Sequence, residues 1–365
     1  MVLRPHDTWS VKCGSFSFVK DARHNPFPAG YQENQMKYQR ITLQDIAALA
    51  GVTKMTVSRY LRTPDKVAPE TAARIAEIMA EVNYMPDPEN RALASNMQPR
   101  IGVIIPSFNN QIFADLLAGI ESVTKPMGYQ TLVVNYDYDR EREEEQIATV
   151  LGFNVAGLIL TETVHTLRTE KYLSAAGIPV AEVMDLVPGS GRINVGFDNF
   201  RAGFDMTNML IASGKKRIIY LGSMADVRDI KRYEGYCKAM ADAGLADGRL
   251  MPNKVSSVSM GTGMMAMARQ MYPDMDGILC TNDDLAAGVL QECQAANIRV
   301  PEQMGIAGFH GLEIGQVTVP KLASVVTPRF EIGKVATEIL LKKINKQPTI
   351  EQVDLHYRLS LGGTL

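Results

Sequence analysis

The hydrophobic positions from Thr42 to Tyr60 repeat at the spacing of two short helices that meet at a turn. On each helix the apolar residues share an inner face: Leu43, Ile46, Ala47 and Ala50 on the first, and Val57, Tyr60 and Leu61 on the second. Gly51 supplies the backbone freedom that a tight turn needs. Thr42 and Thr53 stand at N-cap positions, and Asp45 follows Thr42 as in a capping box. The pattern predicts a helix-turn-helix.

A third helix and a break follow. Pro69 suits a first helical turn, and the next apolar residues recur at helical spacing: Ile75, Ile78, Met79 and Val82. This helix should close a small core on the first two. Pro86 and Pro88 must then end it, and the segment 89–96, which carries Leu93, is too short to form a stable helix alone. We expect that segment to fold only against a partner copy or against DNA.

From Arg100 onward, continuous apolar strands alternate with helices. The expected strands are Ile101–Pro106, Gln130–Asn135, Ala156–Thr161, Pro179–Met184, Arg217–Gly222, Gly277–Thr281, Met304–Gly308 and Ala323–Val326, with helices at Phe113–Val123 and Glu141–Leu151. Such strands are typical of parallel sheets buried on both faces. They are more than one sheet holds comfortably, so the sequence predicts an α/β fold of two doubly wound lobes, with ligand at the carboxyl ends of the strands.

Charge distinguishes the two ends of the 365-residue chain, whose length suggests two or three domains. The whole chain has a net charge of -2, with 46% hydrophobic and 21% charged residues, as in ordinary globular proteins. Residues 37–74 nevertheless carry a net charge of about +4 from the Lys, Arg, Asp and Glu in that range. On the predicted second helix, Lys54, Met55, Ser58 and Arg59 face outward. A small basic module with such a helix is suited to enter a DNA major groove.

Other features of the chain limit its class. Cys13, Cys237, Cys280 and Cys293 form no metal-binding or redox motif, which favours free thiols in a reducing cytosol and predicts neither metal nor cofactor. No stretch approaches the ~20 apolar residues of a membrane span. Residues 1–35 lack periodicity, and Met36 precedes the first helix. We interpret them as translated upstream sequence or a disordered arm, with a DNA-contacting or regulatory tail as the alternative.

Several motifs, in order, resemble the lactose/galactose-repressor family of bacterial regulators from about Arg40 to the C-terminus. They read LQDIAALAGVTKMTVSRYL, NYMPDPENRALA, IGVIIPS, FADLLAGIESV, TNDDLAAGVL, IAGFHGLEIG and LASVVTPR. The VTKMTVSR and GFHG spellings are most similar to regulators of gluconate and idonate use. The resemblance implies a homodimer. After an extension of residues 1–36, each chain would have a DNA-binding domain (37–84), a hinge (85–99) and a two-lobed domain like the periplasmic binding proteins (100–365). Dimer versus tetramer stays open.

The resemblance also implies which residues contact operator DNA. Lys54, Met55 and Arg59 would face base edges, although Met55 could instead simply cover the helix. The residues that would hold phosphates are Thr53, Thr56, Ser58 and Lys66. Leu93 would wedge into the minor groove, unless it is a core leucine. Asp87-Pro88 replaces the more common Asn-Arg, which removes one contact to phosphate or minor groove.

For the effector, the resemblance implies that Phe113 stacks on the ligand and that Asn282 and Arg232 hold its polar groups. Core packing and an N-cap are the alternatives for Phe113 and Asn282. Arg228 precedes Arg232 by one helical turn, and His310 stands where members that bind neutral sugars carry Asp. These changes favour an anion, and we expect a sugar acid such as gluconate or idonate, or a phosphorylated relative. Alternatively, Arg228 pairs with Asp226 or Asp229 at the surface.

Two other classes of protein fit less well. The chain shows no nucleophile elbow, no G-x-G-x-x-G motif and no P-loop, so an enzyme is not expected. A sugar-binding transport component would need a signal peptide and no helix-turn-helix. The expected function is therefore a cytoplasmic DNA-binding regulator, most simply a repressor. Induction and co-repression by the effector both stay open.

Overall fold

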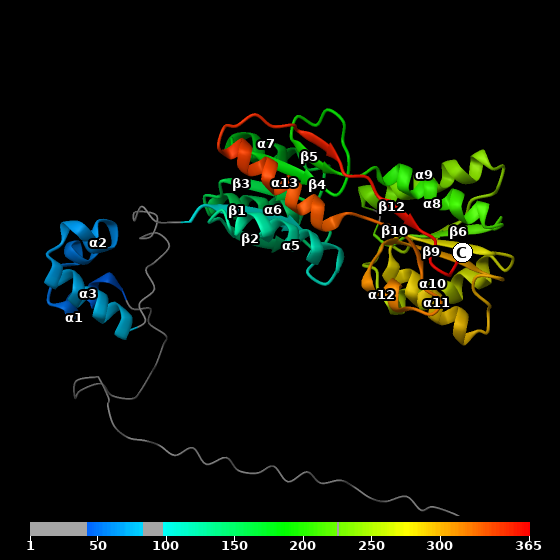
Figure 1. Cartoon of the computed structure of the whole chain (residues 1–365), viewed down its shortest axis with the longest axis horizontal. Helices are drawn as coiled ribbons and strands as arrows, with labels where there is room; N and C mark the ends of the chain where they lie inside the picture. Colours follow the sequence, from blue (N-terminus) through cyan, green and yellow to red (C-terminus); the bar gives the residue numbers. More distant parts are fainter. Residues whose placement is uncertain (1–41, 83–97, 225) are drawn as a thin grey trace, which may run out of the picture. The chain divides into compact units, whose positions relative to one another are not determined.

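A computed structural model describes residues 42–82, 98–224 and 226–365 (Figure 1). The chain divides into two compact units, one up to Met97 and one from Gln98 to Leu365. The predictions for residues 1–41 and for the hinge segment with Leu93 lie outside the described residues.

The first unit is a three-helix domain. It contains α1 (Leu43–Ala50), α2 (Lys54–Arg62), a short 3-10 turn η1 (Pro64–Lys66) and α3 (Pro69–Glu81). The Thr42 side chain accepts from the backbone N–H of Asp45 and completes the predicted capping box, and Thr53 caps α2. Gly51 ends α1 with φ of 64°, a left-handed conformation that favours glycine. The buried core matches the predicted pattern: Leu43, Ile46, Ala47, Ala50, Val57 and Ile75. The helix-turn-helix is confirmed.

The second unit contains two sheets, and the first sheet forms the first lobe. Its strand order is β11-β5-β4-β3-β1-β2, with every pair parallel. The strands are β1 (Arg100–Ile105), β2 (Gln130–Asn135), β3 (Gly157–Leu160), β4 (Val180–Val183), β5 (Ile193–Gly196) and β11 (Gln352–Asp354). Its helices are α5 (Ile112–Thr124), α6 (Arg140–Gly152), α7 (Leu167–Ala176) and α13 (Arg329–Ile344). Nearly all residues of β1, β3, β4 and β5 are buried, as the continuous apolar runs predict.

The second sheet forms the second lobe and repeats this plan. Its order is β12-β10-β9-β8-β6-β7, parallel except where β12 pairs antiparallel with β10. The strands are β6 (Ile218–Leu221), β7 (Arg249–Leu250), β8 (Gly277–Cys280), β9 (Gly305–His310), β10 (Ala323–Val326) and β12 (Arg358–Ser360). Its helices are α8 (Asn199–Ala212), α9 (Val227–Asp242), α10 (Val258–Met271), α11 (Asp283–Ala295) and α12 (Glu313–Val317). The predicted pair of doubly wound lobes is confirmed.

The chain crosses between the lobes three times. It passes from β5 to α8, from β10 to α13 and from β11 to β12, each time within three residues or so of regular structure (Figure 1). In both sheets the direction of winding reverses beside the first strand, at β1 and at β6. Ligands of open α/β sheets bind at the carboxyl ends of strands near such reversals. Short crossings at one side of a cleft also allow the lobes to rotate as rigid bodies.

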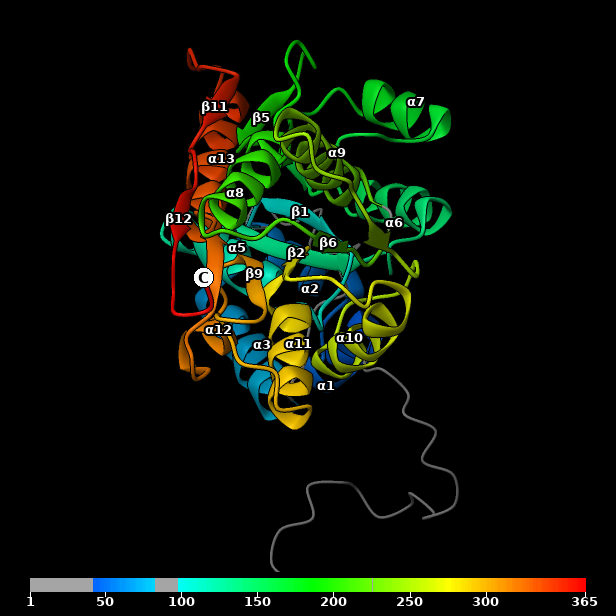
Figure 2. The same cartoon turned by 90° about the vertical axis from the view of Figure 1, so that its right-hand side faces the viewer.

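Two glycines bring α8 and α9 unusually close together, and the helices lie side by side in both views (Figures 1 and 2). A Cβ on Gly235 would lie 2.1 Å from the backbone oxygen of Phe200, and one on Gly203 would lie 2.3 Å from that of Arg232. No real Cβ tolerates such distances, so the two backbones touch directly. This contact fixes the position of α9, and with it Arg232, relative to α8.

We expect Gly235→Ala to destabilise the second unit by about 1–3 kcal/mol, because the new methyl group forces α8 and α9 apart. Gly263→Ala on α10 is a matched control, since its Cβ would meet nothing within 4 Å. That substitution should be neutral or stabilise by up to ~1 kcal/mol. Urea unfolding followed by circular dichroism compares the two, and equal stabilities would contradict the packing argument.

The loop between β3 and α7 is anchored by a buried charge cluster. The fully buried imidazole of His165 has Nδ1 3.1 Å from Glu143 Oε1 and Nε2 3.8 Å from Glu182 Oε1. Arg192 Nη1 also contacts Glu182 Oε1 at 2.6 Å. Burial opposes the charged imidazolium, but the hydrogen bond between Nδ1 and Glu143 and the negative charges of Glu143 and Glu182 outweigh it and raise the pKa of His165 to about 9. His165 is therefore protonated near neutral pH and ties the loop to α6 and β4.

We predict that the first lobe loses stability as the pH rises from about 6.5, the usual His pKa, to about 9. The raised pKa of folded His165 contributes stability that is fully present below the lower value and absent above the higher one. The loss should reach about 2–3 kcal/mol in urea unfolding and should be missing in His165→Gln. His356→Gln, at an exposed position, should keep the wild-type pH dependence. An unchanged profile in His165→Gln would show that the cluster does not hold this proton.

Candidate functional site

The outer face of α2 carries the predicted DNA contacts. Lys54, Met55 and Arg59 are exposed, and Met55 is 66% exposed although it is apolar. The Thr53 hydroxyl caps the helix and lies 2.9 Å from that of Thr56. Thr56 and Ser58 are half-buried, and Lys66 is exposed on η1. The first turn of α2 contains no acidic residue. This face therefore presents two cations beside a helix N-terminus, whose backbone N–H groups favour phosphate.

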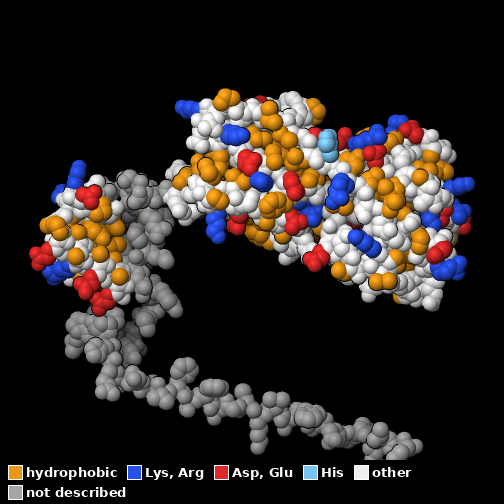
Figure 3. Space-filling view, in the orientation of Figure 1, with side chains coloured by type: hydrophobic (Ala, Val, Ile, Leu, Met, Phe, Trp, Pro, Cys, Tyr) orange, Lys and Arg blue, Asp and Glu red, His pale blue; other side chains and the backbone are white. Residues whose placement is uncertain are grey.

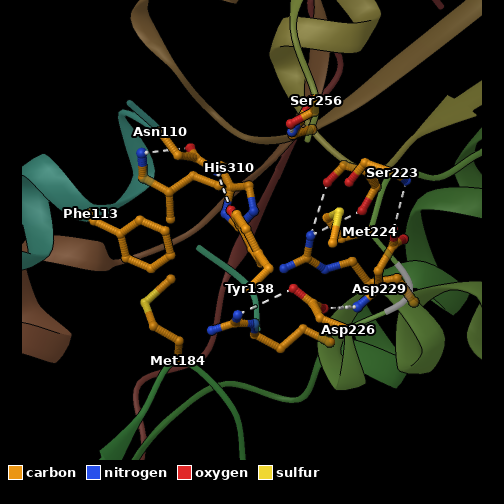
Figure 4. Close-up of a pocket in the computed structure, with 15 residues that line it drawn as sticks. Asn110, Phe113, Tyr138, Met184, Ser223, Met224, Asp226, Asp229, Ser256 and His310 are labelled. Carbon is orange, nitrogen blue, oxygen red and sulfur yellow. Dashed lines mark hydrogen bonds and ion pairs between the residues drawn. The ribbon is translucent and has the colours of Figure 1, made fainter. Parts of the chain in front are cut away.

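A pocket lies between the two lobes of the second unit, at the carboxyl ends of their strands (Figure 4). Its cavity measures about 40 Å³, room for roughly three water molecules. All five predicted effector residues line it: Phe113, Arg228, Arg232, Asn282 and His310. Their convergence from distant parts of the sequence follows from the fold, whereas their contact with an effector stays a prediction.

Arg232 is a buried cation held by neutral groups. Its Nε donates to Asn199 Oδ1 at 2.9 Å, and its Nη1 donates to the Thr281 carbonyl at 2.9 Å. The guanidinium lies 4.0 Å from the centre of the Phe309 ring. Among the described residues, no carboxylate lies within ion-pair distance of it. Burial lowers the pKa of Arg232 below its ordinary value. The site thus holds an ion without a direct counter-ion, which is costly in an apolar environment.

Arg228 is paired, but not at the surface. Its Nη1 donates to the Thr161 carbonyl at 2.8 Å, and its Nη2 contacts Glu162 Oε1 at 2.8 Å and Asp226 Oδ2 at 3.2 Å. The Arg228 side chain is only 7% exposed. The alternative that Arg228 pairs with Asp226 is correct, but this pair lies inside the pocket rather than at the surface. The closer partner, Glu162, was not predicted. Burial would lower the pKa of Arg228, but these two carboxylates raise it well above the ordinary value.

His310 is neutral in this environment. It is 1% exposed, and its Nδ1 lies 3.2 Å from the Thr327 hydroxyl. Burial, with Arg232, Arg329 and Arg228 nearby, lowers the pKa of His310 well below its usual range. His310 therefore adds no positive charge to this wall, and it removes a negative one if relatives that bind neutral sugars carry Asp there, as the resemblance implies.

Phe113 and Asn282 have the structural roles named as alternatives, and both also line the pocket. Phe113 is 3% exposed and belongs to the main core, yet its ring also lines the pocket. Asn282 is the N-cap of α11, with Oδ1 accepting from the Leu285 N–H at 3.0 Å. Its amide nitrogen donates to the Ser256 hydroxyl at 2.5 Å on the pocket wall. The structural alternatives are thus compatible with a ligand contact.

Other pocket residues were not found from the sequence: Asn110, Ile112, Tyr138, Met184, Ser223, Met224, Asp226, Asp229, Ser256 and Thr281. Figure 4 draws Phe113 and Met184 at one end of the pocket and Asp226 at the other. Met184 and Thr281 follow directly on the ends of β4 and β8, which is the signal that could have found them. Tyr138, Met184 and His310 also have positive φ values of 60°, 76° and 92°. Such strained backbone clusters at ligand sites.

Within the described residues no group of three or more His, Cys, Asp or Glu side chains could hold a metal ion. None of the described helices has the length and apolar character needed to cross a membrane. On the face of the second unit drawn in Figure 3, basic and acidic side chains are interspersed.

Comparison with known proteins identifies the family. Residues 42–87 match the model of bacterial regulatory proteins, lacI family, and residues 98–355 match that of periplasmic binding proteins and the sugar binding domain of the LacI family. The HTH-type transcriptional regulator IdnR of Escherichia coli (strain K12) is 52% identical over 332 residues, which cover 90% of this chain and 100% of the relative. The HTH-type transcriptional regulator GntR of the same strain is 47% identical over 331 residues, with the same coverage.

A solved structure agrees over both units. The crystal structure of a LacI family transcriptional regulator from Silicibacter pomeroyi is 34% identical, with a TM-score of 0.79, and the match covers 89% of this chain and 99% of that one. The family predicted from the sequence motifs is thereby confirmed. The chain belongs to the LacI family of bacterial regulatory proteins and is a DNA-binding transcriptional regulator.

Proposed function

We propose that the chain is a repressor that binds operator DNA as a homodimer and is controlled by a sugar acid such as gluconate or idonate. It acts on DNA in the cytoplasm and has no catalytic role. In this proposal α2 reads the operator, and the pocket between the lobes binds the effector. The two functions are supported by different observations.

The exposed face of α2 supports the DNA part. Arg59 can form two parallel hydrogen bonds with guanine, while Lys54 and Met55 contact neighbouring base edges. The residues assigned to phosphates are Thr53, Thr56, Ser58 and Lys66. Helix-turn-helix proteins commonly bind as dimers to two half-sites about one turn of DNA apart, and we propose the same arrangement here.

Arg232 carries the effector part of the proposal. It is a buried guanidinium whose hydrogen-bond partners are all neutral. An arriving carboxylate would supply the missing counter-ion and could accept two hydrogen bonds from one guanidinium. Arg228, one helical turn away, adds a second cation, and His310 adds no negative charge. These properties favour an anionic sugar derivative over its neutral parent.

One observation favours a second candidate, a neutral sugar. Asp226 and Asp229 also line the pocket, and carboxylates are good acceptors for sugar hydroxyls. Their oxygens are already engaged, however. Asp229 accepts from the Ser223 N–H at 2.8 Å and also from the Tyr220 hydroxyl. Asp226 Oδ1 accepts from the Asp229 N–H at 2.8 Å. We therefore favour the sugar acid.

We predict that Arg59→Ala weakens operator binding by about 1–3 kcal/mol and relaxes specificity at one base pair. Gel shifts at fixed salt, with promoter-proximal DNA of the neighbouring genes, measure this change. Arg59→Lys should not restore specificity, because a lysine lacks the planar fork. Arg74→Ala removes the same charge from an exposed position on α3 and should retain base preference. Equal base preference in Arg59→Ala and wild type would exclude Arg59 as a base reader.

For the effector we expect calorimetry to show tighter binding of gluconate or idonate than of the corresponding neutral sugars. Arg232→Met should weaken sugar-acid binding by about 2–5 kcal/mol, because a buried carboxylate then lacks its partner. Arg217→Met, which removes an exposed arginine, is the control and should bind normally. Tighter binding of a neutral sugar would defeat the anion proposal. The same ligands added to gel shifts reveal whether the effector releases or strengthens DNA binding.

A further inference from the structure

We propose that Glu162 occupies the place of an effector carboxylate on Arg228, and that the effector binds by displacing Glu162, which takes up a proton. This inference rests on the proposed sugar-acid function of the pocket. It assigns to Glu162 a role in specificity and makes effector binding proton-linked.

The contacts of Glu162 join the two lobes. Glu162 lies in the loop after β3 of the first lobe, and Arg228 lies on α9 of the second. The Arg228 fork holds both the Thr161 carbonyl and the Glu162 carboxylate at 2.8 Å. A carboxylate thus already sits where an anionic ligand of Arg228 would sit. His165, three residues further along the loop, fixes this arrangement through Glu143 and Glu182.

The size of the pocket requires these contacts to break. A cavity of about 40 Å³ is far smaller than the hundreds of Å³ of ordinary ligand pockets. A sugar acid enters only when the lobes separate, and separation stretches the Arg228 bonds to Thr161 and Glu162. Once they are broken, an effector carboxylate competes with Glu162 for the same guanidinium.

The charges explain why a proton accompanies the effector. Two guanidiniums, Arg228 and Arg232, share this region with the carboxylates of Asp226, Asp229 and Glu162, and His310 is neutral. A further carboxylate leaves four anions facing two cations in a poorly hydrated space. Transfer of one proton from solvent to a Glu162 oxygen restores the original balance. The effector stays ionised, and its single carboxylate is shared between Arg232 and Arg228, one helical turn apart on α9, where it takes the place of Glu162.

Glu162 is the group best placed to accept this proton. Three groups of charged or titratable side chains surround Glu162. Arg228 lies on α9 and Asp226 at its N-cap, Tyr136 and Tyr138 lie in the segment after β2, and Glu143 lies on α6. Burial raises the pKa of Glu162, and Arg228 opposes this only in part. When the effector carboxylate pairs with Arg228 in place of Glu162, the main influence that lowers the pKa of Glu162 is lost. The Tyr136 hydroxyl, 2.7 Å from Glu162 Oε1, remains as a hydrogen-bond partner.

The test is calorimetry of gluconate binding to the full chain at pH 6, 7 and 8, at each pH in two phosphate-free buffers that titrate there. Because these buffers differ in ionisation enthalpy, the comparison counts the protons bound. We expect uptake that approaches one proton per site and an affinity that falls up to tenfold per pH unit as the pH rises. In Glu162→Gln the uptake should vanish, and affinity at pH 8 should rise at least tenfold. Glu234→Gln, at an exposed position on α9, should behave as wild type.

A second variant guards against a folding defect in Glu162→Gln. Tyr136→Phe keeps the carboxylate but removes a donor that favours its charged form. It should move the onset of the affinity loss to higher pH. Binding by wild type without proton uptake, together with unchanged affinity in Glu162→Gln, would overturn the inference and leave the proposed function intact. Failure of wild type to bind any sugar acid would defeat both.

Discussion

The structure of the second unit depends on how buried and half-buried cations between its lobes find partners. Arg228 bonds to the first lobe through Thr161 and Glu162, and Lys231 does so through Asp185 Oδ2 at 2.6 Å. Arg329 joins Asp115 of α5 at 2.7 Å to the His310 carbonyl at the end of β9. Each contact strengthens as water is excluded, so lobe closure and charge pairing reinforce each other. An ionic ligand can therefore shift the closure equilibrium through its differential affinity alone.

Arg232 is tied into the same system through neutral groups. Its partner Asn199 begins α8 and donates to the Met184 carbonyl and to Asp185 Oδ1, both at 3.0 Å. The glycine contact between α8 and α9 keeps Arg232 and Asn199 in register. A ligand bound at Arg232 consequently acts on the segment after β4, which belongs to the first lobe. From there the chain connection to α2 runs through β1 and residues 83–97.

The sequence predicted features that short stretches encode. The capping box at Thr42 and the buried strands are local patterns, and their prediction is confirmed. Strands β5, β7, β11 and β12 were missed because they are short and none of them contains the continuous apolar run of the predicted strands. Resemblance to a family located Arg232 and Asn282, whereas Glu162 was missed. Its partner Arg228 is 66 residues away, and only the fold brings the two together.

The pocket carries mixed charge rather than only positive charge. Counting arginines in the sequence suggested a simply cationic cleft, yet Asp226, the N-cap of α9, turns one oxygen toward Arg228. Because Asp226 caps the helix that carries Arg228, its carboxylate lies beside the Arg228 guanidinium. As a result the two arginines differ in function. Arg232 has no carboxylate partner among the described residues and is ready to receive one, while Arg228 must first exchange the carboxylate that it already holds. The proposed selectivity for an acid rests on this difference, because only an anion would replace Glu162 without leaving Arg228 underpaired.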